Sequence, residues 1–537
     1  MLKTILIANR GEIAVRIIRA CRSLNFRTIA VYSDIDVNSL HVKMADEAYS
    51  LGNDSIQDTY LNIDKIINIA METNSDAIHP GYGFLSESAK FAEEVEKKGM
   101  IFVGPSSKIL HKLGDKVEAK KLAEEVGLET LPYSSTYVET IDEAEKIAKE
   151  IGFPILIKAA FGGGGRGMEI VESPETLESS FNGCQTIAER YFGRKEVFIE
   201  KFILSPKHIE IQFLTDNFGN AVHLGDRECS IQRAHQKIIE EAPSFVSEEI
   251  RKELGKKICN LARNINYTNA GTAEFLWKED IFYFNEINPR IQVEHPITEM
   301  ITGIDIIVQQ LKIANGEKLS FSQEDISISG HALEFRINAE DPMNEFYPQT
   351  GKILGISVPE GKGIRFDTFL YPNYDLPNKF DSLIGKLIVK GDTREEAIKK
   401  SLIALEQLEI AGLVTNISLH KSILETPEFL NRSITTEFLR RYKIVQAKNT
   451  AVISNQEMQK KKSIRREVEI LAPIPGKIAK VLVKEGQNIV ENQELIILEA
   501  MKMRNRIFSP KDGEIKEILI QENEAVIQDQ LLLVLLA

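Results

Sequence analysis

The sequence predicts a multidomain chain that is α/β and α+β over most of its length and ends in a small all-β domain. Its 537 residues are too many for one ordinary hydrophobic core and correspond to roughly three or four domains. Residues 4–33 alternate strand-like apolar runs with helical spacing, as a β-α-β unit does. Residues 467–537 contain an internal repeat of short alternating strands, which predicts two half-domains packed on each other.

The composition is that of a soluble globular protein, with 43% apolar and 27% charged residues. A net charge of −13 argues against general affinity for nucleic acid or anionic membranes. Because there is no long apolar run and no signal-peptide pattern, we expect a cytoplasmic location. The cysteines form no C-x-x-C pair and are expected to be reduced and structural; they are Cys21, Cys184, Cys229 and Cys259.

The N-terminal unit is predicted as a strand over residues 4–8, a helix over 12–24 and a second strand over 27–33. A dinucleotide site would need G-x-G-x-x-G in the first turn, and Gly11 is the only glycine there. We therefore reject that function. The turn-rich loop at residues 79–86 follows another strand, where parallel sheets carry ligands, although its composition alone favours a structural role.

A separate lobe is predicted over residues 132–203, and its centre is a strand followed by a glycine-rich segment. The strand at 154–160 carries Lys158, and five glycines lie within residues 162–167. Such a segment exposes backbone N–H groups that can cradle a polyphosphate, although it is not a Walker loop. A flexible linker is the alternative, but linkers rarely follow a buried strand. We predict a mobile lid over nucleotide phosphates.

A hairpin is predicted over residues 272–288, in a register that puts Glu274 opposite Glu286. Two facing carboxylates repel each other, so the pair persists most readily around a cation. Together with Asn288 they offer the hard oxygen ligands that suit Mg²⁺. An exposed acidic surface is the alternative, which the aromatic and aliphatic neighbours disfavour.

Downstream of the hairpin, three polar residues keep the alternation of Glu286 and Asn288. If the strand continues past Pro289, these residues project to the same side. They are Arg290, Gln292 and Glu294.

The C-terminal repeat has a period of 37 residues: Pro473, Gly476 and Ile478 recur as Pro510, Gly513 and Ile515. Gly486 corresponds to Asn523, and both residue types tolerate positive φ, as a shared tight turn requires. Between the copies lies E-A-M-K-M at 499–503, with Lys502 at its centre.

These motifs resemble a known family. Residues 1 to about 445 resemble biotin carboxylase, an ATP-grasp enzyme, and residues from about 467 resemble the biotinyl carrier domain, an all-β flattened barrel of the biotinyl/lipoyl type. The motifs are A-N-R-G-E-I-A at 8–14, H-P-G-Y-G-F-L-S-E at 79–87, G-D-K-V at 114–117, G-G-G-G-R-G-M at 162–168, H-Q-K at 235–237, E-I-N-P-R-I-Q-V-E-H-P at 286–296 and A-M-K-M at 500–503. The resemblance covers nearly the whole chain.

The resemblance implies a role for each matching residue. ATP would be bound by Lys116, Lys158, Gly163, Gly164, Gly165, Glu200, Lys201, Ile203, His208, Gln232 and His235. Mg²⁺ or Mn²⁺ would be held by Glu274, Glu286 and Asn288. Bicarbonate and biotin would meet Lys237, Arg290, Gln292, Val293, Arg336 and Tyr82, with Glu294 as general base and Arg336 as the positive partner of the biotin enolate. Biotin itself would be attached to Lys502.

The implied domains are an N-terminal α/β domain at 1–113, an ATP-grasp region at 114–445 with a lid at about 132–203 and a C-terminal carboxylase part at about 204–445, a linker at 446–466 and a carrier at 467–537. We expect an enzyme that carboxylates its own biotin, as part of an acetyl-CoA or propionyl-CoA carboxylase. Expected partners are a separate carboxyltransferase, biotin protein ligase and further copies of the chain. The alternatives are a pyruvate or other biotin-dependent carboxylase, a non-biotin ATP-grasp ligase, and a non-catalytic biotinylated scaffold.

Overall fold

The N-terminal part of this computed structural model is a parallel five-stranded sheet in the order β3-β2-β1-β4-β5. Its strands are β1 (Thr4–Ile7), β2 (Arg27–Tyr32), β3 (Glu47–Ser50), β4 (Ala77–His79) and β5 (Ile101–Phe102). The accompanying helices are α1 (Gly11–Ser23), α2 (Leu40–Met44), α3 (Ile63–Glu72) and α4 (Ala89–Lys97). The predicted β-α-β start is confirmed to within one residue at each boundary. The structure describes residues 2–53, 55–159, 167–234, 236–442, 467–490, 493–500, 503–527 and 530–536.

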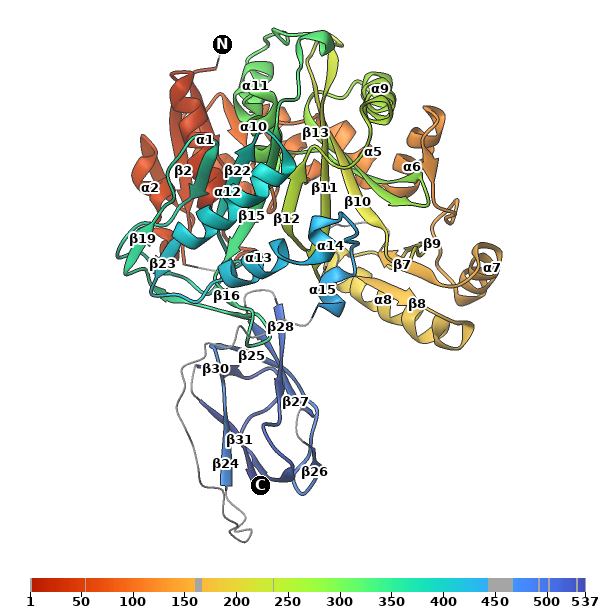
Figure 1. Cartoon of the computed structure of the whole chain (residues 1–537), viewed down its shortest axis with the longest axis vertical. Coiled ribbons are helices and arrows are strands. Elements are labelled where there is room, and N and C mark those ends of the chain that lie inside the picture. Colours follow the sequence, from red (N-terminus) through yellow and green to blue (C-terminus); the bar gives the residue numbers. More distant parts are fainter. Residues whose placement is uncertain are drawn as a thin grey trace.

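A nine-stranded, mainly antiparallel sheet forms the centre of the molecule (Figure 1). In spatial order its strands are β20 (Ile364–Thr368), β22 (Leu383–Gly391), β15 (His331–Asn338), β12 (Gln236–Ala242), β11 (Ala221–Arg233), β10 (Lys207–Thr215), β13 (Asn269–Lys278), β14 (Ile281–Asn288) and β6 (Glu129–Thr130). Helices around it are α5 (Ser107–Gly114), α6 (Lys116–Glu125), α9 (Glu248–Asn264), α10 (His295–Thr302), α11 (Ile306–Ala314), α12 (Arg394–Gln407), α13 (Ile417–Leu424), α14 (Pro427–Leu430) and α15 (Phe438–Arg441).

The predicted acidic hairpin is β13–β14, and Glu274 does pair with Glu286. Its turn consists of Glu279 and Asp280, with φ of 51° and 64°, because Lys278 already pairs with Ile281. The predicted pairing survives because the register shifts beyond Glu274, leaving Asn285 without a partner in the ladder. The strand does not continue past Pro289: β14 ends at Asn288, because proline cannot donate to the ladder.

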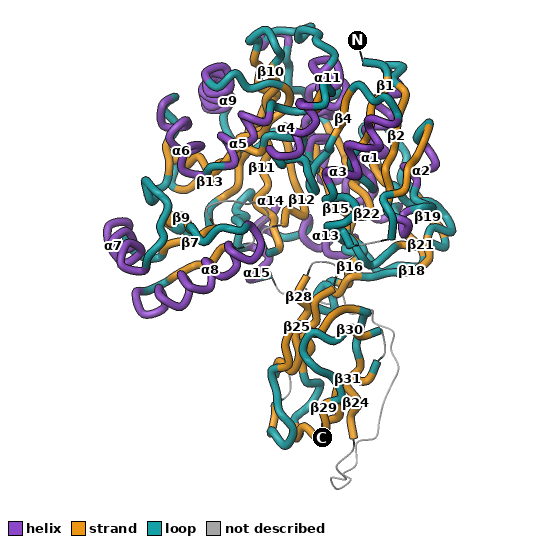
Figure 2. The backbone as a smooth tube through the Cα atoms, turned by 180° about the vertical axis from the view of Figure 1, so that it is seen from behind, coloured by secondary structure: helices purple, strands orange, loops and turns teal. Residues whose placement is uncertain are grey.

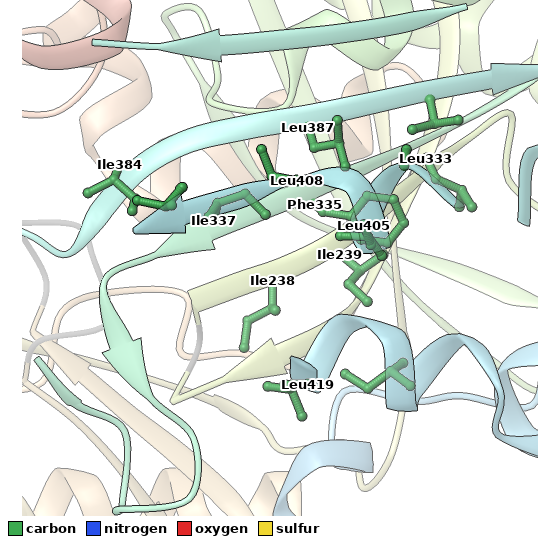
Figure 3. Close-up of a cluster of buried hydrophobic side chains, with 14 of the residues drawn as sticks. Ile238, Ile239, Leu333, Phe335, Ile337, Ile384, Leu387, Leu405, Leu408 and Leu419 are labelled. Atoms are coloured by element: carbon green, nitrogen blue, oxygen red, sulfur yellow. The ribbon is translucent and has the colours of Figure 1, made fainter. Parts of the chain in front are cut away.

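Alternation along β15 sorts its residues between the core and the opposite face of the sheet. Leu333, Phe335 and Ile337 enter a buried cluster with β12, β22, α12 and α13 (Figure 3). Successive side chains on a strand point to opposite faces. Arg336 therefore projects away from this core, toward the face that carries the polar candidates.

The predicted lobe is a three-stranded sheet in the order β8-β7-β9, flanked by two helices. Its elements are α7 (Ile141–Ile151), β7 (Ile155–Ala159), β8 (Met168–Val171), α8 (Leu177–Phe192) and β9 (Val197–Lys201). Helix α7 begins in a capping box between Thr140 and Glu143. Most of the glycine-rich segment, including Gly163, Gly164 and Gly165, lies outside the described residues.

Small two-stranded ribbons complete the part of the chain before the C-terminal domain, residues 2–442, which we call the body. They pair β16 (Glu340–Asp341) with β17 (Tyr347–Pro348), β18 (Gly351–Lys352) with β21 (Asp375–Leu376), and β19 (Gly355–Ser357) with β23 (Glu409–Ala411). All four cysteines are buried and free. Among the described helices, none combines the length and the apolar character needed to cross a membrane.

The C-terminal domain consists of two four-stranded sheets in the orders β24-β31-β29-β26 and β28-β27-β25-β30. The strands are β24 (Glu467–Leu471), β25 (Gly476–Val481), β26 (Asn488–Ile489), β27 (Glu494–Ala500), β28 (Met503–Phe508), β29 (Gly513–Ile518), β30 (Ala525–Val526) and β31 (Leu531–Leu536). The repeat is confirmed in the turns, since Gly486 has φ of 77° and Asn523 of 74°. Lys502 lies outside the described residues.

Candidate active site

A cavity of about 1000 Å³ lies between the central sheet and the lobe, and we call it the large cavity. Among the described residues it brings together every predicted site residue except Tyr82. Those that line it are Lys116, Lys158, Glu200, Lys201, Ile203, His208, Gln232, Lys237, Glu274, Glu286, Asn288, Arg290, Gln292, Val293, Glu294 and Arg336. His235 lies outside the described residues. Residues far apart in the sequence thus converge on one space large enough for a nucleotide.

Lys237 is the hub of the polar network at one end of the large cavity. Its ammonium donates hydrogen bonds to Glu294 at 2.6 Å, to Glu274 at 2.9 Å and to Gln292 at 3.2 Å. It also donates to Glu210 at 2.6 Å. Burial lowers the pKa of Lys237, but these carboxylates outweigh burial and hold the pKa well above its usual value. Lys237 is therefore a fixed positive charge facing the cavity.

Glu294 is held between two cations. One oxygen accepts from Lys237, and the other accepts from the Arg336 guanidinium at 2.9 Å. Burial would raise the pKa of Glu294, but Lys237, Arg336 and Arg227 outweigh it and hold the pKa well below its usual value. The carboxylate is ionised and able to accept a proton from a substrate that displaces one of these donors. Glu240 accepts from the other side of Arg336 at 2.6 Å.

Two residues that the sequence reasoning missed support this hub. Glu210 on β10 pairs directly with Glu274 on β13, so both carboxylates reach Lys237. Arg227 is fully buried and bonds Glu210, Gln212 and Thr298. Glu210 lies two residues after His208 on the same strand, so both side chains point to the same face of the sheet. That spacing could have identified Glu210 as a site residue. Arg227 gave no such signal, because its partners come from strand β10 and helix α10.

The nucleotide end of the large cavity is built on β7 and β9. Lys158 forms an ion pair with Glu200, and Lys120, which we had not predicted, approaches the same carboxylate at 3.1 Å. Burial would raise the pKa of Glu200, but Lys158 and Lys120 lower it to about 2. The pKa of Lys120 is itself lowered, because burial outweighs the attraction of Glu200. Lys158 stands at the cavity wall as the cation that a phosphate would meet.

The remaining nucleotide candidates are held by local contacts. Lys201 donates to the carbonyls of Gly152 and Phe153, both at 2.9 Å, so its ammonium secures the base of the lobe. Gln232 lies 3.0 Å from His208 Nδ1. Both side chains line the large cavity.

The predicted metal ligands offer a donor set suited to a hard cation. Glu274, Glu286 and Asn288 are neighbours on β13–β14 and line the same cavity. The side chain of Glu286 is 42% exposed, and Lys116 approaches it at 3.7 Å. Carboxylate and amide oxygens at a cavity wall are the ligands that Mg²⁺ uses alongside phosphates. A second grouping, His208, Glu210 and Glu274, also lies within metal-binding range, but Lys237 already neutralises two of its carboxylates.

Arg290 and Val293 reach the site through an irregular segment that follows the end of β14 at Asn288. Arg290 bonds Glu87 at 2.5 Å and the Asn288 side chain at 3.1 Å. The Val293 carbonyl accepts a hydrogen bond from Lys386, a fully buried lysine, at 2.8 Å. The hydrogen bond from Lys386 therefore holds the irregular segment against β22.

Tyr82 is the one described candidate that does not line the large cavity. Its hydroxyl donates to Glu12, and Glu12 pairs with Lys386 at 3.1 Å. Lys386 also donates to the Val293 carbonyl, so Glu12 and Lys386 link Tyr82 to the wall of the large cavity. The loop at 79–86 thus supports the site through Glu12.

Four family models match successive parts of the chain. Residues 1–110 match the N-terminal domain of biotin carboxylase, and 115–322 match the ATP-binding domain of the carbamoyl-phosphate synthase L chain. Residues 334–441 match the C-terminal domain of biotin carboxylase, and 468–535 match the domain of biotin-requiring enzymes.

Individual relatives are similar over the first four fifths of the chain. A biotin carboxylase of Nostoc is 49% identical over 81% of this chain and 98% of its own length. A pyruvate carboxylase subunit of Methanothermobacter thermautotrophicus is 47% identical over 82% and 90%. The biotin carboxylase domain dimer of Hydrogenobacter thermophilus 2-oxoglutarate carboxylase, crystallised with MgADP, ADP and bicarbonate, is 46% identical, has a TM-score of 0.80 and is covered over 82% of this chain and 97% of that one.

Proposed function

The chain belongs to the biotin carboxylase family and ends in a biotin-requiring domain, and from that premise we propose that it uses ATP and bicarbonate to carboxylate biotin carried on its own Lys502. The observation that carries this proposal is the position of Glu294 between Lys237 and Arg336, at the wall of the large cavity. A base clamped between two cations suits the deprotonation of a small anion.

The chemistry needs a proton to leave bicarbonate as its oxygen attacks the γ-phosphorus of ATP, and Glu294 accepts that proton. Lys237 and Arg290 orient bicarbonate by charge, and Gln292 by hydrogen bonding. Lys158 and Lys116 meet the phosphates. The attack gives carboxyphosphate and ADP. Carboxyphosphate releases CO₂ and phosphate, and the phosphate can take the ureido proton that biotin loses. Arg336 supplies positive charge where the ureido oxygen of biotin becomes anionic.

Glu274, Glu286 and Asn288 would hold Mg²⁺, which neutralises charge on the transferring phosphoryl group when it is bound. Glu200 keeps Lys158 in place, because its carboxylate is ionised and pairs with that ammonium. Gly163, Gly164, Gly165 and His235 would complete the contacts with ATP. The proposed domains are residues 1–113, 114–445 and 467–537, with a linker at 446–466.

For the acceptor, we propose acetyl-CoA or propionyl-CoA, bound on a separate carboxyltransferase chain in the cytoplasm. Relatives that act in pyruvate and 2-oxoglutarate carboxylases make those two acceptors the second candidates. Biotin protein ligase would load Lys502, and the dimer of the Hydrogenobacter domain favours self-association of this chain as well.

The test has two parts. The purified chain should cleave ATP in a bicarbonate-dependent manner that free biotin accelerates, and the intact protein should carry the covalent mass of one biotin that the Lys502→Arg variant lacks. Biotinylation of the Lys502→Arg variant would contradict the attachment site, and ATP cleavage that is indifferent to bicarbonate would contradict the reaction. Identification of the chain that co-purifies with the biotinylated protein from its own cells decides between the acceptors.

A further inference from the structure

A single tyrosine of the body enters the core of the C-terminal domain. Tyr347, on the short strand β17, is 6% exposed and belongs to the same cluster of buried apolar side chains as the interior of residues 467–536. Its hydroxyl donates a hydrogen bond of 2.6 Å to the backbone carbonyl of Arg506 on β28. Figures 1 and 2 show from opposite sides that the end of the C-terminal domain carrying β28 lies next to β16.

The carbonyl that Tyr347 reaches belongs to an edge strand. β28 ends the sheet β28-β27-β25-β30, so its outer side carries backbone groups without a strand partner. A tyrosine is well suited to such an edge, because its ring buries apolar surface while its hydroxyl bonds a free backbone group. Tyr347 therefore meets both needs of the edge, apolar contact and hydrogen bonding.

The ribbon that presents Tyr347 has an unusual tip. Glu345 and Phe346 both have positive φ, 50° and 59°, although neither is glycine. Such a conformation is strained for a residue with a side chain and persists only where surrounding contacts impose it. The Phe346 amide donates to the Asp341 carbonyl at 2.8 Å, which closes the tip.

The same tip reaches the large cavity on its other side. Glu345 and Phe346 line that cavity, whereas Tyr347 does not. The Arg233 guanidinium lies 4.1 Å from the centre of the Phe346 ring and donates to the Glu345 carbonyl at 3.3 Å. Arg233 ends β11, and its neighbour Gln232 pairs with Lys237 in the sheet. One ribbon thus contacts the C-terminal domain with one residue and the wall of the site with the two before it.

We propose that the ribbon of residues 340–348 is the docking site of the chain's own C-terminal domain, with Tyr347 as its anchor. The ribbon holds the domain beside the large cavity while the attached biotin is carboxylated. This rests on the proposed function, which supplies the reason for the domain to come to the cavity. Docking within one chain needs few contacts, because a tethered domain is present at a high effective concentration. One buried aromatic anchor and one hydrogen bond suit a contact that must also be released.

The experiment compares two forms of biotin in the full-length chain. Tyr347→Ala should slow carboxylation of the biotin attached to Lys502 by about thirtyfold, the loss typical of a buried aromatic anchor. Tyr347→Phe removes the hydroxyl alone and should slow it about fivefold. Carboxylation of free biotin should remain within about twofold of the parent in both variants, because Tyr347 does not line the cavity. X-ray scattering should give a larger radius of gyration for Tyr347→Ala than for the parent.

Tyr49 provides a matched control, since its hydroxyl donates to Glu47 within the N-terminal sheet. Tyr49→Phe should behave as the parent in every assay. Unchanged or faster carboxylation of attached biotin in Tyr347→Ala would overturn the proposal. Failure of the parent with both forms of biotin would instead contradict the proposed function.

A mixing experiment distinguishes docking within one chain from docking between two. Tyr347→Ala carries biotin but lacks the anchor, and Lys502→Arg keeps the anchor but lacks the attachment residue. Docking within one chain predicts that mixing the two leaves carboxylation of attached biotin at the slow rate of Tyr347→Ala. Recovery of the parent rate on mixing would show that the domain docks on a second copy, and would overturn the assignment to the same chain.

Discussion

Replacing Glu294 by Gln perturbs the charge network at a single point. One Glu294 oxygen accepts from Lys237 at 2.6 Å and the other from Arg336 at 2.9 Å. An amide has one acceptor oxygen, so one of these charge-assisted bonds is lost, at a cost of about 1.5–3 kcal/mol. The site stays assembled, because Lys237 keeps its bond to Glu210 and Arg336 keeps its bond to Glu240.

The effect on rate should be larger than the effect on stability. A positioned general base contributes about 10²–10⁴-fold, which corresponds to about 2.7–5.4 kcal/mol of the barrier. Glu294→Gln should therefore lower kcat for bicarbonate-dependent ATP cleavage with free biotin by that factor. The KM for ATP should stay within about threefold, because Lys158 and Glu200 at the nucleotide end form a separate network. Steady-state kinetics with varied ATP and bicarbonate measure both quantities.

Glu299→Gln is the matched control. Glu299 also accepts from two arginines, Arg16 at 3.0 Å and Arg365 at 2.6 Å, but it does not line the large cavity. It should lose a similar amount of stability in denaturant unfolding and keep near-parent turnover. The reasoning is refuted if folded Glu294→Gln turns over within tenfold of the parent, or if Glu299→Gln loses as much activity.

Three further outcomes follow from the same contacts. Arg336→Ala should slow biotin carboxylation at least tenfold more than it weakens ATP binding measured by calorimetry, and equal losses would make it a binding residue. Lys386→Met leaves Glu12 buried without its ammonium and should cost about 3–5 kcal/mol in urea unfolding; the double variant Glu12→Gln/Lys386→Met should recover much of that cost, and no recovery would contradict the pairing. Glu200→Gln should cost about 3 kcal/mol at pH 7, since the pKa of Glu200 is lowered from 4.5 to about 2. This stability is present above pH 4.5 and is lost as the pH falls toward 2, so the gap to the parent should close over that window, and a constant gap would contradict it.

Local patterns were enough to predict much of the fold. The β-α-β start, the acidic hairpin and the paired turns at Gly486 and Asn523 all depend on periodicity or on residue types that tolerate positive φ. The fold class, an ATP-grasp biotin carboxylase followed by a biotinyl/lipoyl-type domain, is confirmed. Alternation left open whether the strand continues past Pro289, and it ends at Asn288 because proline has no N–H to donate to the ladder.

The candidate site was predicted through the motifs, whereas its supporting residues were not. Glu210, Arg227 and Lys386 act through partners on other elements: Glu274 on β13, Thr298 on α10 and Val293 in the irregular segment. Single-sequence spacing carries no information on which elements become neighbours. The same limit applies to Tyr347, whose contact lies 159 residues away in the chain. Pairwise chemistry of this kind becomes visible only once the sheet order is known.

The edge strand β28 has a consequence for solubility. A six-residue edge with free backbone groups is a template on which another copy of the chain can add a strand. Tyr347 covers part of that edge while the domain is docked. If the domain leaves the ribbon, as the proposed docking requires, charge still protects this edge: the Arg506 side chain is 60% exposed, and lysine or arginine on an edge discourages strand addition. Under the proposed docking, the C-terminal domain therefore needs an edge that resists self-association without a permanent cover.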